Sequence, residues 1–334
     1  MVEAITQETI YEPVADDLQA VIAEIATIAD KAPENAPEQA EDLDAQLGHV
    51  LATPGKRVRP ALTLLASRLF GQGSGEMPIK MATAVELLHI ATLVHDDTVD
   101  HADTRRGHQT ASKLWGRNVA VLIGDFVFAT SAMYVCDTNN VRLVRRFAET
   151  ITELARGELN EIYTAWQPSV PLNDYNQRIY DKTASLFCTA AESGAVLGGA
   201  DDTAAKNVRD YGYNIGMAYQ VYDDLLDYQA TSEQLGKPAG HDLSEGIITL
   251  PAIIAAENGA SEEILTFMNA TEEARVDLLP IAVKAIKNSG ALEETYKVAT
   301  GYIDTAIRCL DGIPPSESLD SLLALAEYVQ TRNY

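Results

Sequence analysis

Apolar residues recur at steps of three and four along almost every long segment of this 334-residue chain. This is the spacing of one face of an α-helix, and no segment shows the sustained two-residue alternation of a half-buried strand. Residues 81–99 are apolar almost all round, which indicates a helix buried in the middle of the molecule. The sequence therefore predicts an all-α fold.

Short runs of turn-forming residues separate the helical segments, and none has the composition of a linker between domains. The N-terminal part differs, because an amphipathic stripe is followed by a Pro- and Glu-rich stretch at residues 32–38. The stripe consists of Val14, Leu18, Val21, Ile25 and Ile28. We expect residues 1–45 to form an outer helix and a solvated connection within the same domain as residues 46–334. Ser316 or Ser318 is expected to cap a last helix.

The charge and cysteine content exclude several classes of protein. A net charge of −24 at pH 7 argues against a nucleic-acid-binding protein and against electrostatic attachment to an anionic membrane. Cys136, Cys188 and Cys309 are odd in number and far apart, so they predict neither a disulfide framework nor a zinc site and fit a reducing cytoplasm. We also expect no signal peptide and no apolar stretch long enough to span a bilayer.

Two copies of one acidic pattern, Asp-Asp-x-x-Asp, each end an apolar helical segment. They consist of Asp96, Asp97 and Asp100, and of Asp223, Asp224 and Asp227. On a helix each triplet falls within an arc of about 100°, where like charges repel one another unless a cation neutralises them. Mg²⁺ accepts carboxylate oxygens and completes its coordination with water and phosphate. Two facing triplets are therefore suited to hold a diphosphate through bridging Mg²⁺ and to assist its departure.

Basic clusters stand out in a chain with only 25 Lys and Arg residues. Lys56 and Arg59 are expected to share a face, at i and i+3, at the start of a helix, where the dipole and the free N–H groups favour an anion. The competing interpretation is a solvated basic turn. His89 lies two and three turns before Asp96 and Asp100 on the same face, and it is either a core residue or a functional one.

These residues belong to a larger set of short motifs. The set comprises Gly55-Lys-Arg-Val-Arg-Pro60, His89, Asp96-Asp-Thr-Val-Asp100, Arg105-Arg-Gly107, Gly124-Asp125, Lys182-Thr183, Tyr219-Gln-Val-Tyr-Asp-Asp-Leu-Leu-Asp227, Gly236-Lys-Pro-Ala-Gly240, Asp242-Leu243, Thr249-Leu-Pro251 and Arg332-Asn-Tyr. In order and spacing, from about residue 45 to the end, the chain resembles the trans-polyprenyl diphosphate synthases, in particular the medium- and long-chain type that makes hexaprenyl, heptaprenyl or octaprenyl diphosphate.

The resemblance implies the isoprenoid synthase fold, a bundle of long antiparallel helices around a deep apolar cavity with both acidic triplets at its mouth. It also implies a prenyltransferase, with about three Mg²⁺ ions per site to assist ionisation of an allylic diphosphate such as farnesyl or geranylgeranyl diphosphate. Isopentenyl diphosphate then attacks the allylic cation, and loss of a proton leaves a chain longer by one isoprene unit with a trans double bond. The released diphosphate is the expected proton acceptor.

Carried over to the matching positions, the family's roles divide by ligand. The metal ligands are Asp96, Asp97, Asp100, Asp223 and Asp227. Isopentenyl diphosphate is assigned to Lys56, Arg59, His89 and Arg106. The allylic diphosphate is assigned to Arg105, Lys182 and Lys237, with Thr183 and Gln220 beside the cationic carbon. Two departures affect this last set, because Ile247 and Ser244 stand where many members have a lysine and an arginine.

Related activities are the alternatives. A class I terpene cyclase or a head-to-head synthase has no need of a pocket formed by Lys56, Arg59 and His89, and a catalytically silent subunit usually loses one acidic triplet. A short-chain synthase that makes farnesyl or geranylgeranyl diphosphate remains open. So does a catalytic subunit that needs a small partner chain.

Product length is expected to be set one turn below the first triplet. Ala91 and Thr92, with Leu88 deeper, leave open a cavity floor that a bulky aromatic side chain closes in short-chain relatives. This favours products of roughly thirty to forty carbons, as in the side chain of an isoprenoid quinone, delivered to a membrane. The resemblance also implies a homodimer built from long buried helices, and residues 81–99 are apolar on more faces than one core requires. A cytoplasmic location is expected from the cysteine content.

Overall fold

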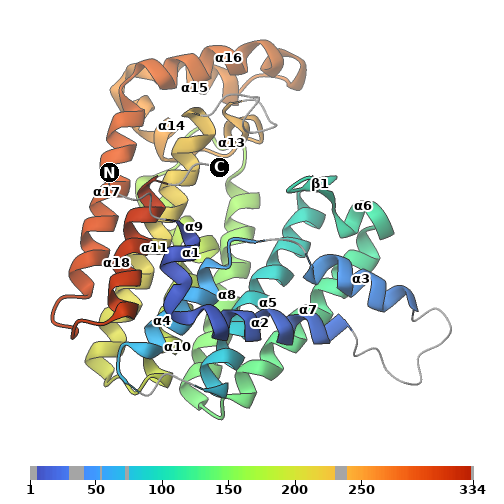
Figure 1. The fold of residues 1–334 in the computed structure, drawn as a ribbon. Coiled ribbons are helices and arrows are strands. Elements are labelled where there is room, and N and C mark those ends of the chain that lie inside the picture. Colours follow the sequence, from blue (N-terminus) through green and yellow to red (C-terminus); the bar gives the residue numbers. More distant parts are fainter. Residues whose placement is uncertain (1–5, 30–40, 53–54, 72–74, 230–238, 332–334) are drawn as a thin grey trace. The chain divides into compact units, whose positions relative to one another are not determined.

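The computed structural model (Figure 1) describes residues 6–29, 41–52, 55–71, 75–229 and 239–331. Its elements in chain order are α1 (Gln7–Tyr11), η1 (Glu12–Val14), α2 (Ala15–Ala29), α3 (Glu41–Leu51), α4 (Val58–Arg68), α5 (Glu76–Val99), β1 (Thr104–Arg105), β2 (His108–Gln109), α6 (Ala111–Trp115), α7 (Arg117–Asp137), α8 (Val141–Thr164), α9 (Leu172–Ile179), η3 (Tyr180–Ala184), α10 (Ser185–Leu197), α11 (Asp202–Gln229), α13 (His241–Ser244), α14 (Leu250–Ala255), η4 (Ala256–Ala260), α15 (Ser261–Met268), α16 (Glu272–Asn288), α17 (Ala291–Cys309) and α18 (Glu317–Thr331). Helices dominate, which confirms the all-α class. Lys237, residues 32–38 and residues 332–334 lie outside the described ranges.

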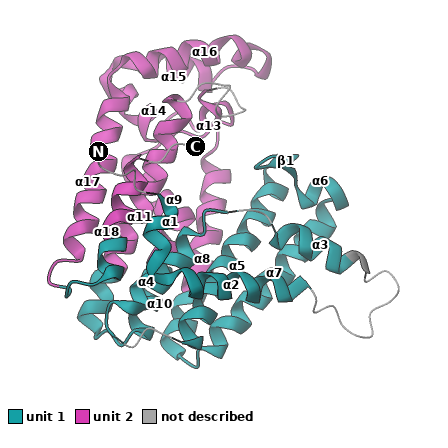
Figure 2. Cartoon of the chain, in the orientation of Figure 1, with its two compact units in different colours: residues 1–148, 189–208, 313–322 teal, residues 149–188, 209–312, 323–334 magenta. Residues whose placement is uncertain are grey.

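The chain divides into two compact units, each assembled from three segments (Figure 2). Unit 1 comprises Met1–Ala148, Thr189–Val208 and Ile313–Leu322. Unit 2 comprises Glu149–Cys188, Arg209–Gly312 and Leu323–Tyr334. The first acidic triplet belongs to unit 1 and the second to unit 2.

Helix α5 is the central element of unit 1. It packs against α2, α4 and α7, and every residue from Met81 to Thr98 is buried or half-buried. This confirms the buried helix predicted from the apolar run. The predicted amphipathic stripe is confirmed as well, because Leu18, Val21 and Ile25 are all buried on one side of α2.

Two glycines allow α10 to approach α4 within unit 1. A side-chain carbon added at Gly194 would overlap the carbonyl oxygen of Thr63, and one added at Gly198 would overlap that of Ser67. The backbones of the two segments are therefore in direct contact, and neither glycine position has room for a methyl group.

In unit 2, a π-helical turn carries Lys182 and Thr183. The turn is η3, and it joins α9 to α10 without a break in the chain of helical residues. A Cβ added at Gly157 of α8 would lie 2.7 Å from Lys182 N, and one at Gly216 of α11 would lie 2.5 Å from Ala184 Cα. The backbones of α8 and α11 thus pack directly against the turn at these two glycines. Single π-turns of this kind are frequent at functional sites.

One predicted helix start is wrong. Helix α4 begins at Val58, and Arg57 before it has a left-handed backbone with φ of 50°. Lys56 therefore lies ahead of the helix and does not share a helical face with Arg59. The predicted cap of the last helix is correct, because Ser316 Oγ accepts a bond from Leu319 N at 3.2 Å at the start of α18.

Two helices, α5 and α7, are long and apolar enough to cross a membrane by length and composition alone. This corrects the expectation that no stretch reaches that length, because each helix contains an 18-residue window with few charged side chains. That window is 67% buried in α5 and 44% buried in α7. A core helix passes the same test, so the two helices are weak support for a membrane segment.

Gly194→Ala is expected to lower the free energy of unfolding by about 1–3 kcal/mol, because the added methyl group meets the backbone of α4. Gly301→Ala is the matched control, since nothing lies within 4 Å of a Cβ added at this exposed site in α17. There the change should stabilise the protein by roughly 0.5–1 kcal/mol through helix propensity. Urea unfolding followed by circular dichroism measures both changes, and equal shifts would contradict the packing at Gly194.

Candidate functional site

The first acidic triplet occupies the C-terminal end of α5. Asp97 is buried, Asp96 is half-buried, and Asp100 is exposed as the C-cap. No basic residue stands in the last turn of this helix. Carboxylates at this end face the negative pole of the helix dipole, which adds to their mutual repulsion. The triplet therefore favours a cation more strongly than its sequence spacing alone indicates.

A small hairpin that the sequence analysis missed places an arginine beside this triplet. Strands β1 and β2 pair antiparallel around a two-residue turn, in which Arg106 and Gly107 have φ of 50° and 80°. Positive φ at both central residues is the backbone of the tight hairpin turns that suit twisted strands. Arg105 Nε donates to Asp97 Oδ1 at 2.7 Å. A predicted metal ligand and a predicted diphosphate contact are thus paired with each other.

The residues predicted to hold isopentenyl diphosphate include a group that gathers around His89 in unit 1. The pKa of His89 lies well below its usual value, first because of burial and then because of four neighbouring guanidinium groups. These belong to Arg59, Arg106, Arg105 and Arg57. His89 is therefore neutral at pH 7, and a concentration of positive charge surrounds it.

A buried ion pair supports this cluster. Arg57 pairs with Glu86, one turn before His89 on α5, and the two side chains are 14% and 4% exposed. A Cβ added at Gly55 would lie 3.1 Å from Arg106 Nη1 and 3.8 Å from Glu86 Oε1. Three charged groups thus converge beside a residue that has no side chain. Neither Arg57 nor Glu86 was predicted from the sequence, although a glutamate within an apolar helix is a usable signal.

Lys56 is tied to the N-terminal helix through its backbone. Its carbonyl oxygen accepts bonds from Gln7 Nε2 at 3.3 Å and from Tyr11 Oη at 3.0 Å. These bonds fix the segment just ahead of α4, where Lys56 and Arg57 stand. Helix α1 therefore contributes directly to the basic region of unit 1.

The second triplet ends α11 in the same way, with no basic residue in the last turn. Asp223 is half-buried, whereas Asp224 and Asp227 are buried. Both oxygens of Asp227 accept backbone N–H bonds, from His241 at 3.1 Å and from Asp242 at 3.2 Å. Asp227 thereby anchors the start of α13, a structural role that the sequence did not indicate.

The carboxyl groups around the second triplet hold protons more readily than usual. Burial raises the pKa of Asp224 to about 6, although bonds from Tyr175 and Gln220 act in the opposite direction. Burial, followed by the charge of Asp227, raises the pKa of Asp242 well above its usual value, while Lys182 lowers it. A nearby cation would relieve the same repulsion.

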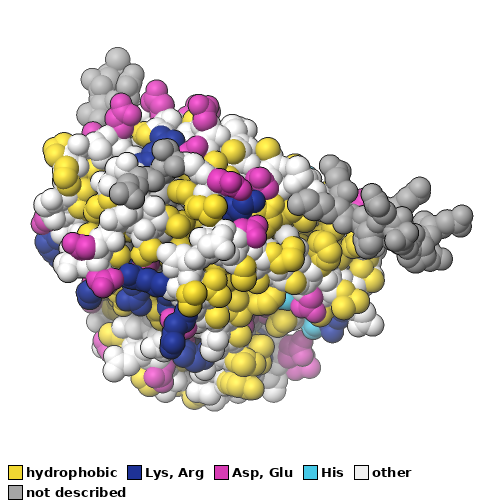
Figure 3. Space-filling model, turned by 90° about the horizontal axis from the view of Figure 1, so that it is seen from below, with side chains coloured by type: hydrophobic (Ala, Val, Ile, Leu, Met, Phe, Trp, Pro, Cys, Tyr) yellow, Lys and Arg dark blue, Asp and Glu magenta, His cyan; other side chains and the backbone are white. Residues whose placement is uncertain are grey.

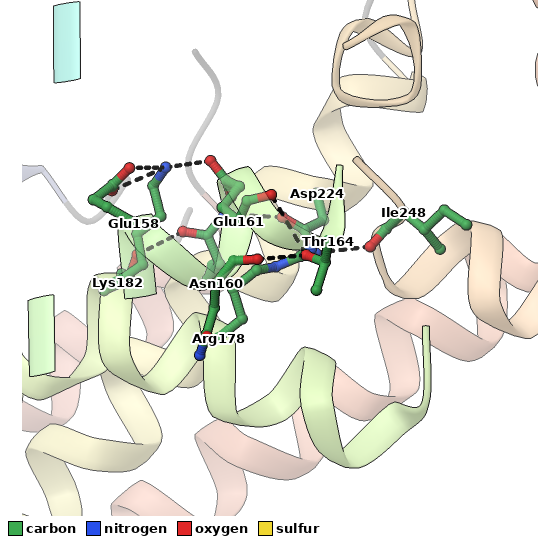
Figure 4. Close-up of polar contacts among 10 residues, drawn as sticks. Glu158, Asn160, Glu161, Thr164, Arg178, Lys182, Asp224 and Ile248 are labelled. Atoms are coloured by element: carbon green, nitrogen blue, oxygen red, sulfur yellow. Dashed lines mark hydrogen bonds and ion pairs between the residues drawn. The ribbon is translucent and has the colours of Figure 1, made fainter. Parts of the chain in front are cut away.

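Lys182 is held by two acidic residues of α8 (Figure 4). Its Nζ lies 3.0 Å from Glu158 Oε1 and 2.5 Å from Glu161 Oε1. Beside it in the π-turn, Thr183 Oγ1 donates to Gln220 Oε1 at 2.7 Å. The structure thus brings together three of the residues predicted to serve the allylic substrate: Lys182, Thr183 and Gln220.

An arginine lies beside the position where the family pattern loses a lysine. Arg178 Nη2 donates to the carbonyl oxygen of Ile248 at 2.7 Å (Figure 4), next to Ile247. Arg178 is buried, and its charge lowers the pKa of Asp224. Arg178 therefore supplies positive charge near the second triplet, and the sequence analysis did not single it out.

The predicted chain-length residues lie on α5. Leu88 and Ala91 are buried, whereas Thr92 is half-buried and donates to the carbonyl oxygen of His89 at 2.8 Å. The half-buried face of the helix carries His89, Thr92 and Asp96. Thr92 therefore lies on the same face as the triplet, and Ala91 lies beside that face in the packed core.

The donor set at both triplets consists of carboxylate oxygens, which suits a hard cation such as Mg²⁺. Within the described part of the chain, no three His, Cys, Asp or Glu side chains converge into a ready-made metal site. Several of the carboxylates already accept bonds from arginine, tyrosine or backbone groups.

Comparisons with known proteins agree with these features. The family model described as polyprenyl synthetase matches residues 40–286. Heptaprenyl diphosphate synthase component 2 of Geobacillus stearothermophilus is 37% identical over 327 residues, which cover 98% of this chain and 99% of the relative. Octaprenyl diphosphate synthase of Escherichia coli is 35% identical over 290 residues, 86% of this chain and 90% of the relative. The crystal structure of heptaprenyl diphosphate synthase from Staphylococcus aureus superimposes with a TM-score of 0.88 at 30% identity, covering 96% of this chain and 98% of that one. The expected isoprenoid synthase fold is confirmed.

The lowered pKa of His89 predicts a pH-dependent stability. The unfolded chain binds a proton on this residue near pH 6.5, whereas the folded protein resists protonation there. The stability linked to neutral His89 is therefore fully present above about pH 6.5. It falls as the pH drops towards the lower pKa of the folded state. When the pH is lowered from about 7.5 to 5, the free energy of unfolding of His89→Gln should rise relative to that of wild type, as measured by urea unfolding at both values. If the stability difference between the variant and wild type is the same at both pH values, the folded protein does not lower the pKa of His89.

Proposed function

The chain belongs to the polyprenyl synthetase family, and on this premise we propose that it extends an allylic diphosphate with isopentenyl diphosphate to make an all-trans polyprenyl diphosphate. It is a prenyltransferase, and long-chain synthases are among its relatives. The observation that carries the proposal is the repeated placement of an acidic triplet at the C-terminal end of a long helix, with cationic side chains beside each. We propose farnesyl or geranylgeranyl diphosphate as the primer and roughly thirty to forty carbons in the product, for the side chain of an isoprenoid quinone.

Magnesium is proposed at both triplets, with about three ions per site. Bound Mg²⁺ would neutralise the charge that develops on the departing diphosphate. Asp96, Asp100 and Asp223 are the strongest candidate ligands, since each is half-buried or exposed. Asp97 and Asp227 are weaker candidates, because Asp97 accepts a bond from Arg105 and Asp227 anchors α13.

The allylic diphosphate is assigned to Arg105, Lys182 and Lys237. Arg105 and Lys182 each hold carboxylates in the structure, so the substrate's phosphate oxygens would exchange with those partners. Thr183 and Gln220 would offer oxygen dipoles to the cationic carbon and contain no competing nucleophile stronger than a hydroxyl. This arrangement stabilises the cation without trapping it.

Isopentenyl diphosphate is assigned to Lys56, Arg59, Arg106 and His89. The guanidinium groups supply charge and forked donors for phosphate oxygens. His89, whose pKa is lowered first by burial and then by neighbouring arginines, would donate one ring N–H. The proton lost after condensation is assigned to the released diphosphate, so no side-chain base is required.

We propose that two copies of the chain associate. The expectation placed the interface on α5, but α5 is buried within unit 1, so that reasoning was wrong. Helix α7 instead exposes Leu122 at 67% and Met133 at 61%, and apolar side chains spread over much of the face in Figure 3. Exposed apolar area of this kind often marks an interface. A small partner chain is the alternative occupant, because one relative is named component 2 of its synthase.

Residues 46–334 are proposed as the catalytic part of a cytoplasmic enzyme, with residues 1–45 belonging to the same domain. The bonds from Gln7 and Tyr11 to Lys56 support this assignment, since they join the N-terminal helix to the basic region.

The proposal is tested with the purified chain, farnesyl diphosphate, labelled isopentenyl diphosphate and Mg²⁺, with products separated by length. Asp96→Ala and Asp223→Ala should each lower the rate about 10²–10³-fold, because each removes a ligand from the leaving-group side. Asp16→Ala, at the exposed member of an acidic pair on α2, is the matched control and should leave the rate unchanged. Near-normal turnover in either triplet variant would sink the mechanism. Activity that appears only after a small partner chain is added would favour the heteromeric alternative.

Product length is expected to shorten when the floor below the first triplet is filled. Thr92→Phe should reduce the main product to about fifteen or twenty carbons without abolishing turnover, because the added bulk excludes longer chains sterically. Ala91→Phe should shorten it too, but with an overpacking cost of about 1–3 kcal/mol in the core. Val298→Phe, at an exposed site on α17, controls for added bulk. The prediction fails if the wild-type product has twenty carbons or fewer, or if the Phe variants make the same longer products as wild type. In either case other residues end chain elongation.

A further inference from the structure

Four side chains of unit 2 form one continuous row of hydrogen bonds. Thr183 Oγ1 donates to Gln220 Oε1 at 2.7 Å, and Gln220 Nε2 donates to Asp224 Oδ1 at 2.9 Å. Tyr175 Oη donates to Asp224 Oδ2 at 2.7 Å. The row connects α9, the π-turn η3 and α11, so three separate elements meet in it. Its two ends have different environments, because Thr183 is assigned to the allylic substrate and Tyr175 is fully buried.

The directions of these bonds fix the orientation of the Gln220 amide. An ionised carboxylate only accepts hydrogen bonds, so the NH₂ group of Gln220 must point toward Asp224. The amide oxygen is then turned to the Thr183 hydroxyl, which donates to it. As long as Asp224 holds its position, Gln220 presents an oxygen on the side where the cationic carbon is assigned.

Tyr175 holds Asp224 in that position. Gln220 binds only one carboxylate oxygen, which leaves the group free to rotate about its Cβ–Cγ bond. The bond from Tyr175 to the second oxygen prevents that rotation. Arg178, which packs its guanidinium 5.8 Å from the centre of the Tyr175 ring, restrains the ring in turn. Tyr175 is separated from Gln220 by Asp224, so it does not touch the substrate itself.

We propose that Tyr175 is a positioning residue for prenyl transfer, which acts through Asp224 to hold the Gln220 amide and the Thr183 hydroxyl in the orientation that stabilises the allylic cation. The inference rests on the proposed function. It separates two roles within the second triplet, because Asp224 orients neighbouring side chains while Asp223 is assigned to metal.

The first test is Tyr175→Phe, which removes one hydroxyl and keeps the ring. It should lower kcat about 10–100-fold, the range found when a supporting hydrogen bond behind a functional group is removed. The KM values for both diphosphates should stay within about twofold, because no binding residue is lost. Tyr134→Phe is the matched control, since Tyr134 donates to Glu24 at the same 2.7 Å and is assigned to neither substrate nor metal. Both variants should lose comparable thermal stability, and only Tyr175→Phe should lose kcat.

The second test asks whether Tyr175 acts through Gln220. In a Gln220→Ala background, Tyr175→Phe should cause no further loss of kcat, because the group that it orients is already absent. Two losses that multiply would overturn the inference, as would a Tyr175→Phe enzyme with unchanged kcat. If Tyr175→Phe does not fold, Asp224→Asn replaces it, because this change preserves volume but leaves one acceptor oxygen, so the side chain no longer accepts from both Tyr175 and Gln220. Asp224→Asn should then show the same kcat loss and the same masking by Gln220→Ala, and losses that multiply would again overturn the inference.

A wild-type chain without prenyl transfer would overturn the proposed function and this inference together, whereas an active wild type with an unaffected variant would overturn the inference alone.

Discussion

Negative charge at the C-terminal ends of α5 and α11 is the constraint on which the rest of the site depends. Both helices end in aspartates where the helix dipole already disfavours them. The aspartates of each triplet have different partners: Arg105 binds Asp97, backbone N–H groups bind Asp227, and Tyr175 binds Asp224. These bonds hold the carboxylates in place at a cost in repulsion that a bound cation relieves. Both helix ends therefore keep mutually repelling carboxylates in place, an arrangement that a bound cation would stabilise.

The helical fold and the triplets could be predicted because they depend on spacing along one element. A three- and four-residue period needs no knowledge of the partner helix, and three aspartates within five residues share a face wherever the helix lies. The alignment of His89 with Asp96 could be predicted in the same way, and both side chains are half-buried on α5. The lowered pKa of His89 could not be predicted, because it depends first on burial by other elements and then on arginines of α4, of the residue before α4 and of the hairpin.

Pairings between distant segments left no signal of this kind. Arg57 and Glu86 are 29 residues apart and Arg156 and Asp181 are 25 apart, yet each pair is a side-chain ion pair. Local backbone exceptions were missed for another reason. The left-handed conformation of Arg57 is rare for a residue other than glycine, so the start of α4 was placed too early. Two-residue strands are too short to show alternation, and the π-turn at Lys182 has no sequence pattern that separates it from a regular helix.

The close approach of Gly157 to the backbone of Lys182 has a mechanical consequence. Glu158 and Glu161, which hold the Lys182 ammonium group, follow Gly157 on the same helix. The lysine thus contacts α8 at both its main chain and its tip. A shift of residues 157–161 of α8 would therefore displace the ammonium group as well, so the position of this charge depends on the packing of a helix to which no substrate or metal contact is assigned.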